Sequence, residues 1–156
     1  MKKLLFFLSF LISLHSFSQK TEKLALRKYK IATLSDSLKE TSGLTFLKDK
    51  LYTLNDGGNT NEIFEIDKNS GKILSKLKIN FPNKDWEAMT SDGENFYIGD
   101  FGNNAGNRRD LAIYKIDFQG SYSKNSFNYS AQDDFSKRYL SHNYDAEAMI
   151  FRNEKI

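Results

Sequence analysis

The sequence contains no cysteine, one proline, one tryptophan and two histidines among its 156 residues. Without cysteine the chain can form no disulfide and use no thiol chemistry, so a stable fold needs a sizeable hydrophobic core. His15 lies in the N-terminal hydrophobic segment, which leaves His142 for the rest of the chain and excludes a multi-histidine zinc site. A Ser-His-Asp triad would depend on His142 alone, and no Gly-x-Ser-x-Gly elbow is present.

Long hydrophobic runs are also lacking, apart from the run from Leu4 to Leu14 that follows Lys2 and Lys3. This run is much shorter than the roughly 20 residues that a membrane-spanning helix needs. A basic start, a short apolar run and small residues before Gln19 are typical of a signal peptide. We therefore expect residues 1–18 to be a signal peptide, no membrane span after its removal, and a secreted, periplasmic or cell-surface protein. Because no cysteine follows the run, a lipoprotein anchor is excluded.

The chain has little excess charge of either sign. Removal of the signal peptide would leave 21 basic and 20 acidic residues, a formal charge of +1. This balance gives no electrostatic reason to expect a nucleic-acid partner. We expect any partner to be an extracellular protein, a peptide or a glycan.

An internal repeat is the most informative feature that is present. The letters ETSGL at 40–44 and LNDGGN at 54–59 resemble EAMTS at 87–91 and IGDFGN at 98–103, and EAMIF at 147–151 begins a third copy. A period in the forties is typical of a β-propeller blade. Counted by register, both hairpins should place their Glu and their Asp at the same end.

Short alternating apolar segments separated by Asx and Gly turns predict strands throughout. We predict an all-β fold of antiparallel four-stranded propeller blades, with two full blades and a fraction of a third. The fourth strands are expected at 72–79 and near 126–130. The expected organisation is an N-terminal strand (23–34) and linker within 19–37, repeat 1 at about 38–83, repeat 2 at about 84–130, a connection at 131–144, and the start of repeat 3 at 145–156.

The length is small for a propeller, since a closed ring of six blades at this period needs roughly 250 residues. The Asp of the third copy would fall near position 160, so we expect the chain to be an incomplete propeller, a fragment of a longer protein. In the complete protein, the strand at 23–34 would close the ring. The alternative is oligomeric closure, in which several chains complete one ring.

These motifs resemble secreted bacterial β-propellers of the SdiA-regulated, NHL and regucalcin-like kind, especially exported propeller proteins of Bacteroidetes, which often carry a type IX sorting domain. The resemblance covers residues from about Leu38 to the C-terminus. It implies an exported propeller, and in some members a calcium-dependent lactonase or an esterase-like activity. It rests on the DWEAM and YIGDFGNN segments as well as on the repeat.

The repeated carboxylates are the candidate metal ligands. Three glutamates, one from each copy, and two aspartates should gather at one end of a central channel: Glu40, Glu87, Glu147, Asp56 and Asp100. Such a group of hard oxygen ligands suits Ca²⁺. The alternative is structural: each Glu accepts backbone N–H groups of the neighbouring blade, and the Asp-Gly segments are plain turns. The spacing does not fit an EF-hand.

A second set of residues could contact an organic ligand. Asn59 and Asn103 follow the two aspartates, Arg108 and Arg109 lie in the loop at 103–110, and Trp86 could stack on a sugar or belong to the core. Two functions follow from these features. The first is a non-catalytic binding or scaffold module, and the alternative is a calcium-dependent hydrolase of the lactonase or phosphoesterase type.

Overall fold

The computed structural model describes residues 23–136, 139 and 141–156. The chain divides into two compact units, one up to Lys30 and one from Ile31 to Ile156. The predicted signal peptide at 1–18 lies outside the described residues. Among those residues, no helix has the length and apolar character needed to cross a membrane.

The strand predicted at 23–34 is wrong. The described part of the first unit contains a 3₁₀ helix, η1 (Leu26–Tyr29), and residues 30–34 have no regular structure. The apolar side chains of Leu24, Leu26 and Tyr29 are exposed. An apolar alternation becomes a strand only where a neighbouring strand offers a hydrogen-bonding ladder, and none of the described strands pairs with this segment.

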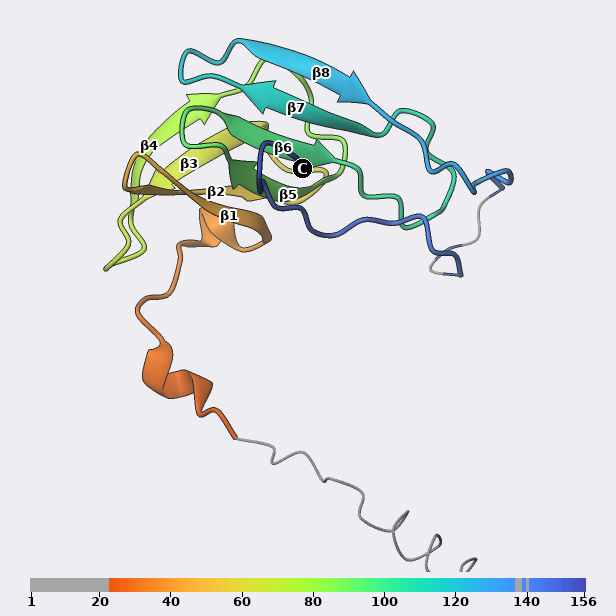
Figure 1. Ribbon diagram of the computed structural model, residues 1–156. Helices are drawn as coiled ribbons and strands as arrows, with labels where there is room; N and C mark the ends of the chain where they lie inside the picture. Colours follow the sequence, from red (N-terminus) through yellow and green to blue (C-terminus); the bar gives the residue numbers. More distant parts are fainter. Residues whose placement is uncertain (1–22, 137–138, 140) are drawn as a thin grey trace, which may run out of the picture. The chain divides into compact units, whose positions relative to one another are not determined.

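The second unit contains two antiparallel four-stranded sheets, which confirms the predicted all-β class (Figure 1). A short 3₁₀ helix, η2 (Asp36–Leu38), precedes the strands. In each sheet the strands follow one another in chain order, and neither sheet closes on itself. The first sheet consists of β1 (Thr41–Leu47), β2 (Lys50–Asn55), β3 (Glu62–Ile66) and β4 (Ile73–Lys78). The second consists of β5 (Trp86–Ser91), β6 (Phe96–Asp100), β7 (Ala112–Ile116) and β8 (Tyr122–Ser126).

Local turn chemistry fixes the two leading hairpins. Between β1 and β2, Lys48 and Asp49 both have positive φ (49° and 62°), the geometry of a two-residue turn that matches the strand twist. Between β5 and β6, the Asp92 carboxylate accepts the backbone N–H groups of Glu94 and Asn95. Both turns contain the Asx or Gly residues by which the sequence predicted turns between strands.

The main core lies between the two sheets. Leu54 and Ile63 of the first sheet face Ile98 and Ile116 of the second, and all four are almost completely buried. The strands β1 and β5 also lie in contact. On the far side of the first sheet a smaller cluster forms around Leu38, and on the far side of the second sheet another contains Phe127, Tyr129, Ala146 and Met149.

The fourth strand of the second sheet begins earlier than predicted. The expected range was 126–130, but β8 covers Tyr122–Ser126. All five of its residues are exposed, so no apolar alternation marks this edge strand. Phe127 and Tyr129, which suggested the later range, pack instead on the far side of the second sheet. The fourth strand of the first sheet, β4, does lie inside its predicted range of 72–79.

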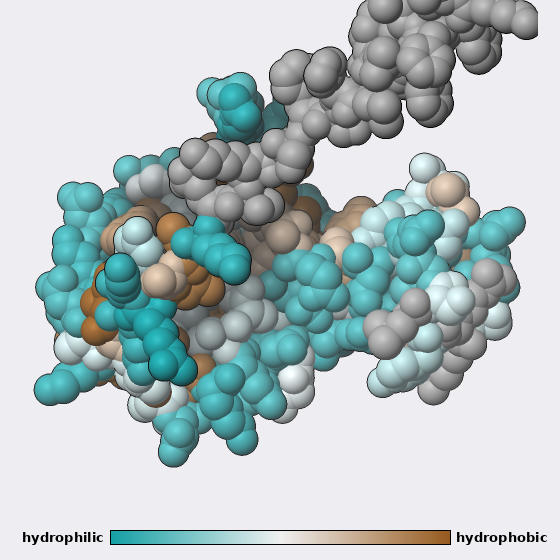
Figure 2. Space-filling model, turned by 90° about the horizontal axis from the view of Figure 1, so that it is seen from below, coloured by the Kyte–Doolittle hydropathy of each residue, from teal (hydrophilic) through white to brown (hydrophobic). Residues whose placement is uncertain are grey.

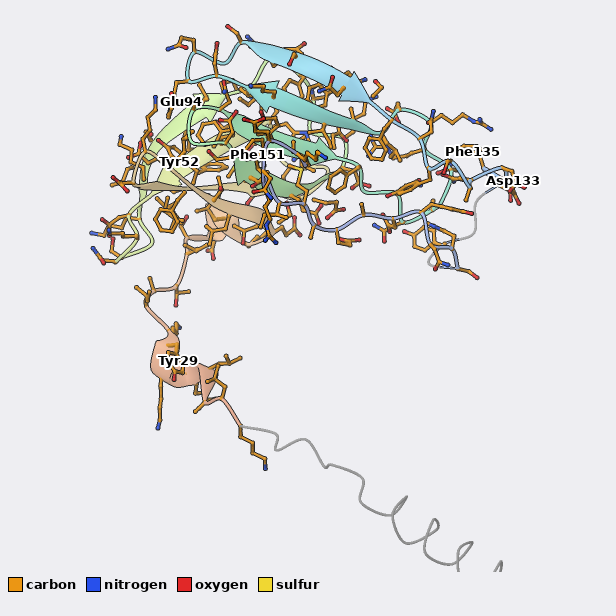
Figure 3. All side chains as sticks on the ribbon, viewed as in Figure 1. Tyr29, Tyr52, Glu94, Asp133, Phe135 and Phe151 are labelled. Atoms are coloured by element: carbon orange, nitrogen blue, oxygen red, sulfur yellow. The ribbon has the colours of Figure 1, made fainter. Side chains whose placement is uncertain are left out.

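The third copy of the repeat contacts the second sheet without forming a ladder. Residues 145–151 have no strand assignment, but the Phe151 ring stacks on Tyr97 of β6, and the Phe151 N–H donates to Thr90 Oγ1 of β5 (Figure 3). A turn follows, in which Arg152 pairs with Lys155 around two residues with positive φ (50° and 61°). This turn repeats the geometry of the β1–β2 hairpin.

Candidate functional site

Three carboxylates from both sheets meet at the ends of β2 and β5. Asp56 follows β2, Asp85 precedes β5, and Glu87 lies inside β5. One oxygen from each lies within 4.8 Å of the other two. Asp85 and Glu87 are 29 and 31 positions after Asp56 in the sequence. They lie next to Asp56 because β5 contacts β1, the hairpin partner of β2. We call these three residues the acidic cluster.

A β-bulge places Glu87. In the β5–β6 ladder Trp86 faces Asp100 and Ala88 faces Gly99, so Glu87 is the extra residue. Bulges re-aim a side chain and often occur at functional sites. The same bulge occurs in β1, where Thr41 faces Asn55 and Gly43 faces Leu54.

The shared bulge corrects the alignment of the repeats. Because Ser42 is the extra residue of β1, it occupies the position of Glu87, which the sequence had assigned to Glu40. Likewise Asn55, rather than Asp56, corresponds to Asp100. The predicted clustering of each Glu and Asp at one strand end is nevertheless found, because the Asp56 N–H donates to the Glu40 carbonyl and Asp100 faces Trp86.

Glu87 is a buried carboxyl in an acidic environment. Its exposed fraction is 7%, and the carboxyl of Glu147 lies next to its own carboxyl. Burial first, and then the negative charges of Asp56, Glu147 and Asp85, raise the pKa of Glu87 from 4.5 to about 8. No basic side chain or backbone N–H in the described parts of the chain contacts this carboxyl. A buried ionised carboxylate without a partner is costly, so at neutral pH the group must hold a proton or a cation.

Asp85 connects the cluster to a basic side chain. Its carboxylate lies 4.0 Å from Arg108 Nη1. Burial nevertheless raises the pKa of Asp85, helped by the charges of Asp56, Asp145 and Asp100, while Arg108 acts in the opposite direction. Arg108 belongs mainly to Asp100, whose carboxylate accepts from Nη2 at 2.8 Å. The cluster therefore keeps an excess of negative charge.

Two glycines form the wall around the carboxylates. A Cβ atom at Gly57 would lie 2.3 Å from Asp85 Oδ1, and one at Gly102 would lie 2.3 Å from Glu87 Oε1. Both distances are impossible for a real side chain. Glycine at these positions therefore leaves the space next to the carboxylate oxygens open.

The remaining predicted metal ligands lie in different surroundings. Glu40 is exposed, and its Oε2 accepts from Asn59 Nδ2 at 2.8 Å. Asp100 is almost fully buried and paired with Arg108. Glu147 is exposed and contacts the cluster through Glu87. Of the five predicted ligands, the structure brings together Asp56, Glu87 and Glu147.

The predicted ligand-binding residues are mostly structural. Asn59 completes the turn after β2 through its Nδ2 bonds to the Asp56 and Gly57 carbonyls. Asn103 is buried, donates from Nδ2 to the Tyr144 carbonyl and accepts the N–H of Arg108.

The sugar-stacking interpretation of Trp86 is wrong. Its side chain is completely buried between the sheets, 5.5 Å from the Phe81 ring. Arg109 is exposed, and its guanidinium lies 3.7 Å above the Phe135 ring. Of the five predicted ligand-binding residues, Arg109 is thus the most accessible.

Sequence reasoning missed Asp85. A signal was available, because Asp-x-Glu occurs at 85–87 and again at 145–147. In the Asp-x-Glu segment at 145–147, the Asp145 carboxylate accepts the backbone N–H of Asn103. Asp145 therefore fastens the third copy to the loop after β6.

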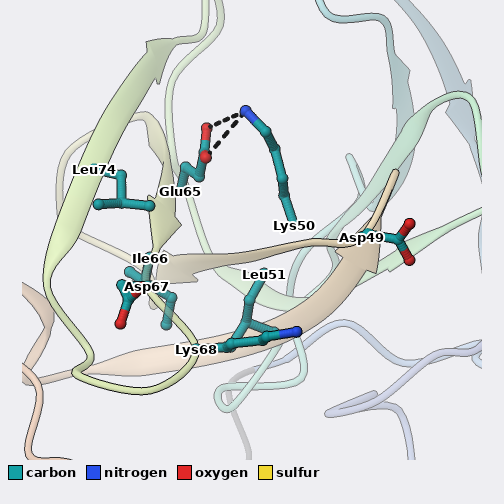
Figure 4. Close-up of a pocket in the computed structure, with 8 residues that line it drawn as sticks. All are labelled: Asp49, Lys50, Leu51, Glu65, Ile66, Asp67, Lys68 and Leu74. Carbon is teal, nitrogen blue, oxygen red and sulfur yellow. Dashed lines mark hydrogen bonds and ion pairs between the residues drawn. The ribbon is translucent and has the colours of Figure 1, made fainter.

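A separate hollow at the surface of the first sheet has a volume of about 150 Å³ and contains none of the predicted site residues (Figure 4). Lys50 and Glu65 form an ion pair there, with Nζ 3.1 Å from Oε1. The other charged residues of the hollow are Asp49 and Lys68, which are exposed, and Asp67, which accepts from Ser70, so the hollow offers no buried charged group comparable to Glu87.

The acidic cluster offers oxygen ligands only. Hard oxygen donors favour Ca²⁺ or Mg²⁺ over Zn²⁺ and the softer transition metals. In comparisons with known proteins, the chain matches no protein-family model, and no curated protein matches it significantly. Functional inference therefore rests on the site itself.

Proposed function

We propose that the protein is an exported binding module of the β-propeller type, in which the acidic cluster holds a Ca²⁺ ion between two blades. The observation that carries the cation is Glu87, a residue with an exposed fraction of 7% whose carboxyl has acidic neighbours and receives no basic or N–H partner among the described residues. A divalent cation would neutralise these groups together. Flexible oxygen cages of this kind suit Ca²⁺ better than Mg²⁺, which requires near-octahedral geometry.

The blade interpretation is supported by the repeated register. The two sheets have the same strand order and the same bulge in their first strand, and they stack face to face. The third copy contacts the second sheet and ends in the same turn as the β1–β2 hairpin. Stacking of identical four-stranded units is the principle of a propeller. Export is proposed from the signal-like sequence at 1–18.

The loop at 103–110 is the surface that we propose for partner binding. Its base is held by buried groups, since Arg108 donates to the Gly102 carbonyl and Gln132 donates to the Gly106 carbonyl. Asn104 and Arg109 at its tip are exposed. A rigid loop with an exposed guanidinium is suited to a carboxylate or glycan on an extracellular partner.

Calorimetric titration of CaCl₂ into the purified protein tests the cation site, with MgCl₂ as the selectivity control. We expect one Ca²⁺ per chain and weaker Mg²⁺ binding. Glu87→Gln and Asp85→Asn should each weaken Ca²⁺ binding by about tenfold or more, a loss of about 1.4 kcal/mol. Glu40→Gln is the matched control, because Glu40 is exposed and lies outside the acidic cluster. Absence of Ca²⁺ binding at millimolar metal would remove the proposal.

The calcium-dependent hydrolase is the second candidate. It is favoured by the contact between buried Glu87 and exposed Glu147, because two carboxyls in different environments are able to exchange a proton beside a bound metal. Hydrolysis of an aryl ester and of a simple lactone should then require Ca²⁺ and decrease strongly in Glu147→Gln. A protein that binds Ca²⁺ but hydrolyses neither substrate would favour the binding module.

A further inference from the structure

The first sheet has a hydrophobic face that is covered only in part, on the side away from the second sheet. Leu44 and Phe46 of β1 are 60% and 58% exposed. The view toward the underside of the molecule shows hydrophobic side chains among hydrophilic ones (Figure 2). Leu34 and Leu38 cover part of this face, next to Phe64 and Ile66. Exposed apolar patches of this kind often mark interaction sites.

The second sheet shows what this face is built to contact. Leu44 faces Thr53 across β1–β2, and Met89 faces Ile98 across β5–β6, so the two residues occupy the same position. Met89 is 4% exposed and packs against the first sheet. The other equivalent pairs are Leu51 and Phe96, Phe64 and Tyr114, and Ile66 and Ile116. The partly covered face of the first sheet thus matches a face that another sheet buries in the second.

The surface that packs on such a face has a small residue at the same position of each repeat. At the junction of the two sheets, Gly43 lies so close to Met89 that a Cβ on it would be 2.7 Å from the Met89 nitrogen. At the next junction, Ala88, which occupies the position of Gly43, packs in one cluster with Met149. A small residue therefore contacts an apolar residue of the following unit at both junctions.

The third copy presents the next small residue of this series. Met149 and Phe151 are partly buried against the second sheet. Ala148 and Ile150 alternate with them and are exposed, Ile150 by 69%. Ala148 occupies the position of Gly43 and Ala88 in the repeat, and no residue in the described parts of the chain covers it.

We propose that copies of this chain associate head to tail, with Leu44 and Phe46 of one copy packed on Ala148 and Ile150 of the next. In this contact Ala148 takes the place of Gly43 and Ala88, the small residues at the two junctions within the chain. Leu44 takes the place of their apolar partners, Met89 and Met149. Because the two surfaces differ, the contact is heterologous, and it produces a closed ring or an open filament. This inference goes beyond the proposed function and does not depend on the cation.

Cysteine cross-linking tests the register, because the chain has no cysteine of its own. The Leu44→Cys and Ala148→Cys variants are purified separately, mixed, and treated with oxidised glutathione, which supplies the oxidant for a disulfide between copies. We expect a mixed dimer on a non-reducing gel. The control pair, Ser75→Cys with Lys124→Cys, uses exposed positions outside the contact and should give only a background of dimer.

Light scattering over a concentration series provides the independent readout. The unmodified protein should increase in mass with concentration, and Leu44→Asp should stay a single chain, while Lys124→Asp, at an exposed position of β8, should associate normally. A single-chain mass at every concentration would overturn the proposal. Cross-linking of Leu44→Cys with itself as strong as in the mixture would also overturn it, since that result indicates a symmetric contact.

Discussion

Replacing Glu87 with glutamine should flatten the pH dependence of stability in the metal-free protein. Burial and the neighbouring Asp56, Glu147 and Asp85 raise the pKa of Glu87 from its ordinary 4.5 to about 8. The folded chain therefore binds this proton more tightly than the unfolded chain does. The resulting stabilisation is complete below about pH 4.5 and is lost as the pH rises through about 8.

The size of the effect follows from the same pKa. Each tenfold change in an ionisation constant is worth about 1.4 kcal/mol, which sets an upper limit of about 5 kcal/mol on the loss between acid and alkaline pH. Domains of this size are stabilised by about 5–15 kcal/mol in total. Solvent screens the charges around this carboxyl, because Glu147 is exposed, and we therefore expect a smaller loss of about 2–4 kcal/mol.

Urea unfolding in EDTA at pH 5, 7 and 9 measures this loss as the free energy of unfolding. The unmodified protein should lose more stability toward pH 9 than Glu87→Gln does, because glutamine cannot ionise. Glu40→Gln removes an exposed carboxyl outside the acidic cluster and should follow the unmodified protein. If the unmodified protein and Glu87→Gln have parallel pH profiles, the assigned environment of Glu87 is wrong.

Three further predictions concern the core, the wall of the site and export. Ile98→Ala should lower the free energy of unfolding by about 2–5 kcal/mol in urea, because it leaves a cavity between the sheets, whereas Leu74→Ala at an exposed position should change it little. Gly57→Ala should weaken Ca²⁺ binding in calorimetry, since its Cβ would collide with Asp85. The control is Gly58→Asn, at an open position with positive φ. It should leave the Ca²⁺ affinity unchanged, because Asn tolerates that conformation. Expression with residues 1–18 in a bacterial host should yield a product that starts at Gln19 by intact mass, and a product that keeps Lys2 would contradict the signal peptide.

The hairpins could be predicted because their information is local. The Asp92 turn and the alternation of Phe96 and Ile98 define the β5–β6 hairpin within a few residues of sequence. The exposed edge strand β8 has no such alternation, and its position depends on pairing with β7. The segment at 23–34 has apolar residues but no pairing strand among those described, so its pattern misled the prediction.

The site could be predicted only in part, because its geometry depends on a bulge and on contacts between sheets. The repeat pattern identified Asp56 and Glu87, which the structure brings together. Sequence spacing could not show the bulge, and so it grouped Glu40 with them. Asp85 was missed because it precedes its strand, and its closeness to Asp56 arises from the packing of one sheet on the other.

The bulge position explains why the acidic cluster lies at one junction of two similar sheets. In the first sheet this position holds Ser42, whose hydroxyl donates to the Trp86 carbonyl at 2.7 Å and joins the two sheets directly. In the second sheet the same backbone geometry holds Glu87, an acceptor that faces the acceptor Glu147. Two carboxylates cannot bond each other unless a proton or a cation lies between them. The junction that Ser42 closes by a hydrogen bond is therefore, at Glu87, a junction that needs either a proton on the carboxyl or a bound cation.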